Sequence, residues 1–367
     1  MSRFAAGRIW GSGLRHTGIR ACSSLSARRL WYSDNARRLP NMVIRTLLVL
    51  LLLAGGCTRM RFIVEAVPAE DELTETEVLR DEGASASAPK IALIDISGLI
   101  MDAERPGLLR RGENPVSRFT ESLRKAADDH RVQGVVVRIN SPGGGVTACD
   151  ILYREVLRFK EQTGRPVVIL MADVAASGGY YIACAGDEIV AHPTTVTGSI
   201  GVIIQTFNFS EGMRKIGIRA DAITSGSNKA MGSPFEPMPP EHRALLQGIV
   251  DEFYAGFVEV VAERRPRISP ADLEWIEDGR VITGRRAAQV GVVDRLGDLQ
   301  VAFDAAKTRA DVDRARLVKY HRPIEYVGSA YGSGPAAGTQ FNLLQLNLPG
   351  SDLDQPGFYY LWDPLVW

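Results

Sequence analysis

The chain has 367 residues, of which 45% are hydrophobic and 23% are charged, so it can build one large core or two modest ones. Its formal net charge is zero, but residues 1–57 hold nine arginines and one acid, which leaves 34 basic and 42 acidic residues downstream. An acidic folded part argues against nucleic acid as a partner. The four cysteines are too few for a disulfide framework, and no Cys/His spacing suggests zinc, so no metal or other cofactor is implied. Cys149 and Cys184 are expected to pack as small buried residues.

The segment 42–57, "MVIRTLLVLLLLAGGC", has the composition of an export signal. An arginine is followed by an apolar run too short to span a bilayer, and small residues precede a cysteine. This order resembles a bacterial lipoprotein signal, in which Cys57 would be lipidated and become the mature N-terminus. Ordinary cleavage and an uncleaved anchor remain alternatives. The sequence therefore predicts a bacterial membrane-associated protein whose folded part is exported to the periplasmic or extracytoplasmic side.

Residues 1–41 are rich in arginine and serine and nearly free of acids. This composition looks like an organelle transit peptide. A start codon assigned too early, with Met42 as the true start, explains it more simply. We expect residues 1–41 to be an extension or leader outside the folded domain.

Residues 58–89 are expected to be a flexible tether. They include "EAVPAEDELTETEVLRDEGASASAP", which is acidic and poor in aromatic side chains. The sequence contains no internal repeat, so a single folded domain is predicted over 90–320.

The expected elements of this domain alternate between strand and helix. "VQGVVVRIN" at 132–140 is a continuous apolar run of the kind that is buried on both faces of a parallel sheet. It enters "SPGGGV", a helix at 147–162 and a strand at 166–171, an order typical of a right-handed crossover unit and of an α/β fold. The other expected elements are a strand at 90–100, a helix at 114–130 capped by Asn114, a turn and helix within 173–190, strands at 187–192 and 217–226, a helix at 239–265, and short helices with one strand at 269–310.

Residues 321–367 form a Gly/Pro-rich tail that ends in "FYYLWDPLVW". So many aromatic side chains are expected to dock on a protein surface. Packing against its own domain, a contact between subunits and a plug in the active site all remain open.

The stretch "DVAASGGYYIACAGDEIV" places Ser177 before two glycines and a run of small residues. A serine hydroxyl becomes a nucleophile when a base takes its proton and hydrogen-bond donors stabilise the oxyanion that follows. At a sharp turn into a helix, the N–H of Gly178 would point into the same space as the Ser177 hydroxyl. The glycines of "NSPGGGV" can expose further N–H groups, with Gly144 the best candidate donor. A phosphate loop is the competing interpretation, but the Lys-Ser/Thr ending of a P-loop is absent, so the two motifs together suggest an oxyanion hole.

Two residues are candidates for the base. His192, in "IVAHPTTV", is the one histidine near the predicted site, although a histidine at a strand end is commonly structural. Lys229 lies in the Gly/Ser-rich loop "TSGSNKAMGSPF", and a lysine can serve as a base if burial lowers its pKa toward neutrality. Arginine cannot deprotonate and so cannot act as a base. Because this chain has 36 arginines and only seven lysines, a lysine in this loop suggests a general base. The residues alone leave both candidates open.

Four separated motifs resemble the signal peptide peptidase A family. They are "RINSPGGGV", "ADVAASGGYYIACAGDEIVAHPTTVTGSIGV", "SGSNKAMGSPF" and "GRVITGRRAAQVGVVDRLG", and they occur in the family's order over about residues 90 to 310. The resemblance implies an α/β, Clp/crotonase-like fold of repeated ββα units, and a Ser-Lys peptidase with Ser177 as nucleophile and Lys229 as general base. It also implies that Ser199 orients the lysine ammonium and that Gly144 and Gly178 are the oxyanion-hole donors. The family often reads "SGKYK" where this chain reads "SGSNK", so binding around the site is expected to differ.

The resemblance implies a serine endopeptidase that hydrolyses cleaved signal peptides or other membrane-released peptides through an acyl-enzyme, with no cofactor. It also implies a homo-oligomeric ring in which the serine and lysine come from different subunits. The small residues around Ser177 predict shallow pockets, for small or modest apolar side chains at the cut. A crotonase-like acyl-CoA enzyme and a non-catalytic peptide-binding scaffold are the alternatives.

Overall fold

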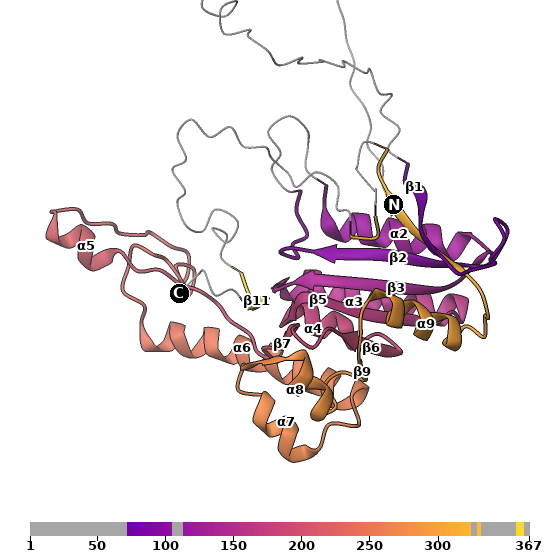
Figure 1. Cartoon of the computed structure of the whole chain (residues 1–367). Coiled ribbons are helices and arrows are strands. Elements are labelled where there is room, and N and C mark those ends of the chain that lie inside the picture. The colour runs from indigo at the N-terminus through magenta and orange to yellow at the C-terminus, as the bar shows by residue number, and fades with distance from the viewer. Residues whose placement is uncertain (1–71, 105–112, 324–328, 332–356, 363–367) are drawn as a thin grey trace, which may run out of the picture. The chain divides into compact units, whose positions relative to one another are not determined.

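The computed structural model describes residues 72–104, 113–323, 329–331 and 357–362 (Figure 1). The predicted leader, the predicted signal and Cys57 lie outside these residues. None of the described helices combines the length and the apolar character that crossing a bilayer requires.

A largely parallel sheet is the centre of the described part, as the apolar runs predicted. Its strand order is β1-β10-β2-β3-β5-β6-β9. The parallel core consists of β2 (Lys90–Ser97), β3 (Val132–Ser141), β5 (Val167–Ala176) and β6 (Glu188–Ala191). The α/β class is therefore confirmed.

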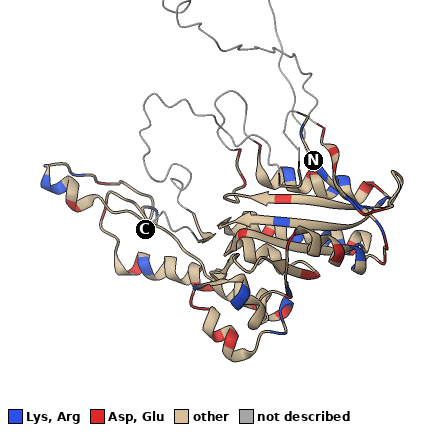
Figure 2. Ribbon diagram, viewed as in Figure 1, with Lys and Arg blue, Asp and Glu red and all other residues tan. Residues whose placement is uncertain are grey.

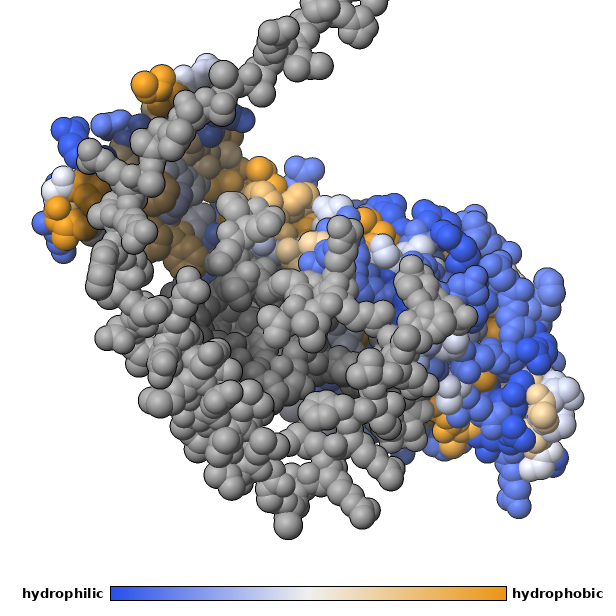
Figure 3. Space-filling view, turned by 90° about the horizontal axis from the view of Figure 1, so that it is seen from above, coloured by the Kyte–Doolittle hydropathy of each residue, from blue (hydrophilic) through white to orange (hydrophobic). Residues whose placement is uncertain are grey.

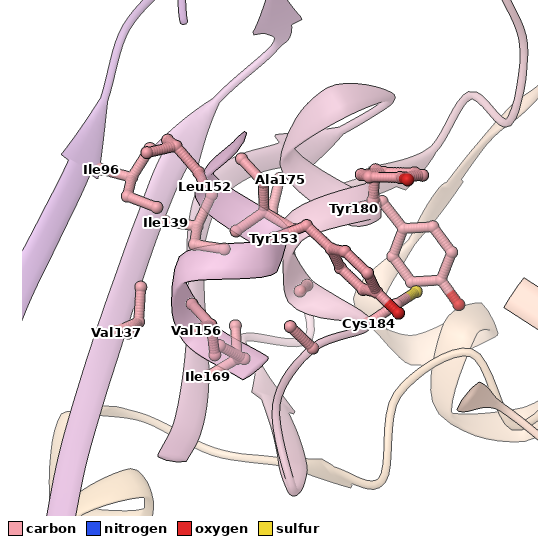
Figure 4. Close-up of a cluster of buried hydrophobic side chains, with 14 of the residues drawn as sticks. Ile96, Val137, Ile139, Leu152, Tyr153, Val156, Ile169, Ala175, Tyr180 and Cys184 are labelled. Carbon is pink, nitrogen blue, oxygen red and sulfur yellow. The ribbon is translucent and has the colours of Figure 1, made fainter. Parts of the chain in front are cut away.

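Alternate residues of these strands enter two different cores, because side chains of a strand point to opposite faces. On one face, Val137, Ile139 and Ile169 pack against the helices α2 (Pro115–Asp128) and α3 (Val146–Thr163), and Figure 4 shows part of this cluster. On the other face, strand residues pack against α9 (Leu299–Arg309). Coverage on both faces explains the apolar run Val135–Val137 within β3.

Local signals in the sequence predicted several boundaries correctly. The side chain of Asn114 accepts hydrogen bonds from the N–H groups of Val116 and Ser117 and so caps α2. Gly164 ends α3 with a left-handed φ of 65°. The remaining elements of this region are α4 (Gly178–Ala183), β7 (Val196–Gly198) and the long helix α6 (Pro240–Arg264).

The prediction of a flexible tether over 58–89 is wrong for part of that range. β1 (Thr74–Arg80) pairs antiparallel with β10 (Arg316–His321), a strand that the sequence analysis did not identify. The acids that suggested a solvated tether are partners of buried cations instead. Glu75 lies 2.5 Å from the ammonium of Lys90, which is 1% exposed, and Glu77 lies 3.2 Å from Arg316. Figure 2 shows that both signs of charge lie mixed over the outer elements.

The segment after α6 differs slightly from its prediction of short helices and one strand. It contains α7 (Pro270–Ile276), β8 (Val281–Thr283), α8 (Gly284–Gln289) and β9 (Arg295–Leu296) before α9. The second short strand, β9, pairs with β6. Arg265, at the end of α6, donates a hydrogen bond of 2.9 Å to Asp294, so a largely buried ion pair holds the long helix to this segment.

Residues 203–239, which we name the arm, extend away from the sheet and carry the short helix α5 (Ser210–Lys215) (Figure 1). The predicted strand at 217–226 is wrong, because these residues have no regular structure. The segment is exposed throughout, and no described strand lies beside it to accept and donate backbone hydrogen bonds.

Candidate active site

Ser177 lies at the sharp turn between β5 and α4, as its surroundings in the sequence predicted. Its backbone has φ 52° and ψ −116°, a region that costs energy for any residue other than glycine. Its N–H donates to the carbonyl oxygen of Gly198 over 2.8 Å, which holds the turn. The side chain is 1% exposed, and its hydroxyl has no hydrogen-bond partner among the described residues. A buried hydroxyl without a partner in a strained turn indicates a functional role.

Ser199 lies beside Ser177. It follows β7, which runs parallel to β5 with Gly198 in register with Ala176. Ser199 is 7% exposed and its N–H donates to the carbonyl oxygen of Arg280 over 2.7 Å. Two serines that are 22 residues apart in the sequence are therefore placed at the same edge of the sheet.

The glycine loop and the Ser177 turn meet at Gly143 and Gly178, while the predicted donor Gly144 lies against Ile100. A Cβ at Gly144 would lie 1.9 Å from the carbonyl oxygen of Ile100, and a Cβ at Gly178 would lie 2.4 Å from the sulfur of Cys149. Gly143 has φ 107°, and a Cβ there would lie 2.8 Å from the nitrogen of Gly178. Only glycines permit this close approach of two backbones, so the glycine loop lies directly against the turn that carries Ser177.

Lys229 is not in this space. It is exposed and lies in the arm, where its N–H donates to the carbonyl oxygen of Gly226 over 3.1 Å. Since the Ser177 hydroxyl has no partner among the described residues, Lys229 of the same chain does not contact it. The structure brings together Ser177, Ser199, Gly144 and Gly178 and leaves the lysine apart.

His192 is also separated from Ser177. Its neighbour Ala191 is in register with Met171 of β5. The histidine therefore lies about five residues before Ser177 along the strand direction, roughly 16 Å at the usual rise of about 3.3 Å per residue. This separation argues against His192 as the base.

Comparison with known proteins identifies the family. The model of "Peptidase family S49" matches residues 159–313, a range that includes Ser177, Ser199 and Lys229. A protein of Enterococcus faecium named "Putative signal peptide peptidase SppA" is 32% identical over 294 residues, which cover 78% of this chain and 84% of that protein. The chain belongs to peptidase family S49. This S49 protein is a serine-type peptidase. Membership of the family favours peptide hydrolysis over the two alternatives, an acyl-CoA enzyme and a non-catalytic peptide-binding scaffold.

Other relatives of this S49 peptidase are longer. Protease 4 of Haemophilus influenzae is 34% identical over 218 residues, which cover 59% of this chain but only 34% of that protein. Among solved structures, a membrane-bound stomatin-specific protease matches with a TM-score of 0.40 and 17% identity, over 59% of this chain and 84% of that one.

The two cysteines near the site of this S49 peptidase are buried, as predicted. Burial raises the pKa of Cys149 far above its usual range and that of Cys184 to about 12. Both thiols are therefore protonated at neutral pH and do not compete with Ser177 as nucleophiles. The described residues contain no group of His, Cys, Asp and Glu suited to a metal ion.

A part of the C-terminal tail lies in the site, and its residues were not identified individually from the sequence. β11 (Tyr359–Leu361) pairs antiparallel with β4 (Gly143–Gly145), which is the glycine loop (Figure 1). The aromatic composition of the tail was the signal that it would dock. Where it would dock depended on backbone pairing, to which composition gives no guide.

Proposed function

We propose that this S49 peptidase hydrolyses peptides through an acyl-enzyme on Ser177, with Lys229 of a neighbouring copy as the general base. The unpartnered, buried hydroxyl of Ser177 beside the backbones of Gly143 and Gly178 carries the proposal. The Ser177 proton passes to the lysine amine, and the Ser177 oxygen attacks the peptide carbonyl carbon. The N–H groups of Gly144 and Gly178 stabilise the oxyanion, and Ser199 orients the lysine.

The remaining steps complete the hydrolysis. The carbon–nitrogen bond of the peptide breaks, and the leaving amine takes the proton from the lysine ammonium. A water molecule, activated by the same lysine, then attacks the ester carbonyl and releases Ser177 and the acid product.

The exposed surface of the arm supports a base supplied by a neighbouring copy. The arm holds six of the ten large hydrophobic side chains that are exposed among the described residues, including Phe207, Phe209 and Ile223. Figure 3 shows hydrophobic residues at the end of the molecule that carries α5. An apolar surface of this kind is typical of an interface. Assembly through the arm would bury this surface and could carry Lys229 to the Ser177 site of the next copy in a ring.

We further propose that the substrates are signal peptides after their release, or other peptides released from membranes. The Enterococcus relative bears the name of such an enzyme. Attachment to an exported membrane face through a lipidated Cys57 would place the site next to these substrates.

A complementation experiment tests the shared site. The full chain and its Ser177→Ala and Lys229→Ala variants would be assayed alone and as re-formed mixtures, on a fluorogenic signal-peptide substrate. Lys215→Ala is a matched control, since Lys215 is also an exposed lysine of the arm. We expect loss of activity in each of the first two variants, partial recovery in their mixture, and normal activity in the control. An active Lys229→Ala variant would refute the lysine assignment, and no recovery in mixed rings would refute sharing.

A further inference from the structure

The loop that carries Lys229 has hydrogen bonds that run mainly within the loop itself. The N–H of Lys229 donates to the carbonyl oxygen of Gly226 over 3.1 Å, and the N–H of Met231 donates to that of Asn228 over 3.2 Å. Each of these bonds closes a turn of four residues. Such bonds give the loop its shape, but they do not fix its position relative to the rest of the protein.

His242 connects this loop to a different part of the chain. Its Nε2 lies 3.0 Å from the carbonyl oxygen of Ser227, which is two residues before Lys229. Among the described residues, this is the one hydrogen bond that joins residues 225–231 to a residue outside 224–233. A carbonyl oxygen can only accept, so Nε2 carries a proton and donates. The bond therefore requires a hydrogen-bond donor at this position and does not require a charge.

The helix that carries His242 is anchored in the core. His242 lies in the first turn of α6, and Phe257 and Val261 of the same helix are fully buried in the main hydrophobic cluster. A helix keeps its residues at a fixed spacing of about 1.5 Å along its axis, so its buried half also fixes the position of its first turn. The His242 bond therefore connects the lysine loop to the core of its own subunit.

Side-chain packing does not replace this bond. A hollow of about 230 Å³ lies beside the loop, and its lining includes Ser227, Ala230, Met238 and His242. Both Ser227 and Lys229 are exposed. A loop next to open space can shift with the loss of few van der Waals contacts, each of which contributes little. Without the His242 bond, we expect the loop to occupy several positions.

We propose that His242 is a positioning residue, whose hydrogen bond fixes the loop that presents Lys229 to Ser177 of a neighbouring copy. This proposal rests on the proposed function of Lys229 as the general base. Proton transfer requires the lysine nitrogen to lie about 2.6 to 3.2 Å from the serine hydroxyl. A displacement of about 1 Å can lower the rate by about 100-fold, so a bond two residues from the lysine is close enough to control kcat.

Steady-state kinetics of full-chain variants test the proposal. His242→Leu removes the donor and should lower kcat on a fluorogenic peptide by about 10- to 100-fold. KM should stay within about twofold of the wild-type value, because the lysine acts in the chemical step. His242→Gln keeps an N–H donor and should retain kcat within about threefold. Arg243→Leu is the matched control, since Arg243 is exposed in the same turn of α6, and it should behave like the wild type.

A double variant shows whether His242 acts through the lysine. The rate at which a fluorophosphonate labels Ser177 is measured for the wild type, Lys229→Ala, His242→Leu and the variant with both changes. Replacement of His242 should slow labelling in the wild-type background and have no further effect in the Lys229→Ala background. An equal loss in both backgrounds would overturn the proposal, because a general structural role does not depend on the lysine.

Two further results would count against the positioning role. A His242→Gln variant as slow as His242→Leu would show that the hydrogen bond is not the cause of the loss. Dissociation of His242→Leu, measured by light scattering, would assign the loss to assembly instead.

The same variants separate failure of this proposal from failure of the proposed function. A normal kcat in His242→Leu, beside an inactive Lys229→Ala, overturns the positioning role alone. A fully active Lys229→Ala overturns the general base and the positioning role together.

Discussion

Ser177 and Ser199 follow two neighbouring parallel strands at the same level and share a φ of 52°. The shared register brings the hydroxyl-bearing residues to one edge of the sheet, and hydrogen bonds to Gly198 and Arg280 hold their backbones in place. Positive φ values in residues other than glycine are uncommon, and strain of this kind gathers at functional sites. The edge is completed by the glycine loop, which closes on the turn after Ser177.

Gly143→Ala should strongly reduce peptidase activity. The added methyl group would lie where the Tyr360 carbonyl oxygen now lies, so it should exclude the substrate carbonyl from the donors. We expect a fall in kcat of about 100-fold or more, measured on a fluorogenic peptide. The control is Gly164→Ala, which has a similarly positive φ but no atom within 4 Å of the added Cβ. It should cost about 1 to 2 kcal/mol of stability and keep its activity. Normal turnover by Gly143→Ala would contradict this placement of the substrate carbonyl.

Tyr360 of β11 is 4% exposed, its ring lies 5.1 Å from that of Tyr181 and 4.8 Å from that of Phe257, and its hydroxyl donates to the carbonyl oxygen of Phe253. This pocket should bind the side chain of the residue before the cut. Three peptides with Tyr, Phe or Ala at that position would be compared by kcat/KM. The kcat/KM of the Tyr peptide should exceed that of the Phe peptide by about fivefold. The reason is that Phe lacks one hydrogen bond of about 1 kcal/mol to the Phe253 carbonyl oxygen. Tyr should exceed Ala by about 10-fold or more because Ala leaves the pocket empty. A preference for Ala would support the shallow pocket predicted from the sequence instead.

A charge on the apolar surface of the arm should disrupt assembly and activity together. Ile223 is fully exposed, so Ile223→Asp removes no contact within the described chain. If the arm is an interface, the buried aspartate should dissociate the oligomer, measured by light scattering, and reduce activity by about 100-fold or more because the lysine is lost from the site. Tyr331→Asp, at an exposed position outside the arm, should change neither the oligomer nor the activity. A fully active monomer of Ile223→Asp would show that the site does not require the arm of a neighbour.

Loss of the ion pair between Arg265 and Asp294 should unfold the region that carries α6. Burial favours the neutral carboxyl of Asp294, but hydrogen bonds and charge from Arg265, with the N–H of Ile189, outweigh it and lower the pKa. The stabilisation is therefore present above the unfolded pKa of about 4 and is lost as the pH falls through the folded value. Asp294→Asn should destabilise the protein by about 3 to 5 kcal/mol at pH 7, because Arg265 remains buried without its partner.

Urea unfolding at pH 7 and pH 3 measures this effect. The difference in unfolding free energy between the wild type and Asp294→Asn should be smaller at pH 3 than at pH 7. Asp278→Asn is the control, since Asp278 pairs with Arg280 at the surface, with side chains 52% and 37% exposed, and loss of this pair should change stability little. An equal difference at both pH values would show that the carboxylate charge of Asp294 is not what stabilises the fold.

The sequence by itself determined the features that depend on neighbours in the chain. The apolar run of β3 needs cover on both faces, which already implies an α/β sheet. Asn114 before Pro115 is enough to start a helix, because the cap forms within one turn. Small residues after Ser177 indicate a turn in which backbone and hydroxyl remain open, and the two glycine motifs are the segments that the structure packs against each other.

Only the tertiary structure decided the features that depend on partners far away in the chain. The acids of β1 are solvated in an isolated segment, but they pair with Lys90 and Arg316 once β10 provides a strand beside them. The segment 217–226 has the composition of a strand, yet no described strand lies beside it. The tail reaches the glycine loop because backbone groups of the two segments pair as strands, and composition does not predict such pairing. The separation of Lys229 from Ser177 also could not be predicted from neighbours in the chain, since it depends on the position of the arm and on the residues that pack against it.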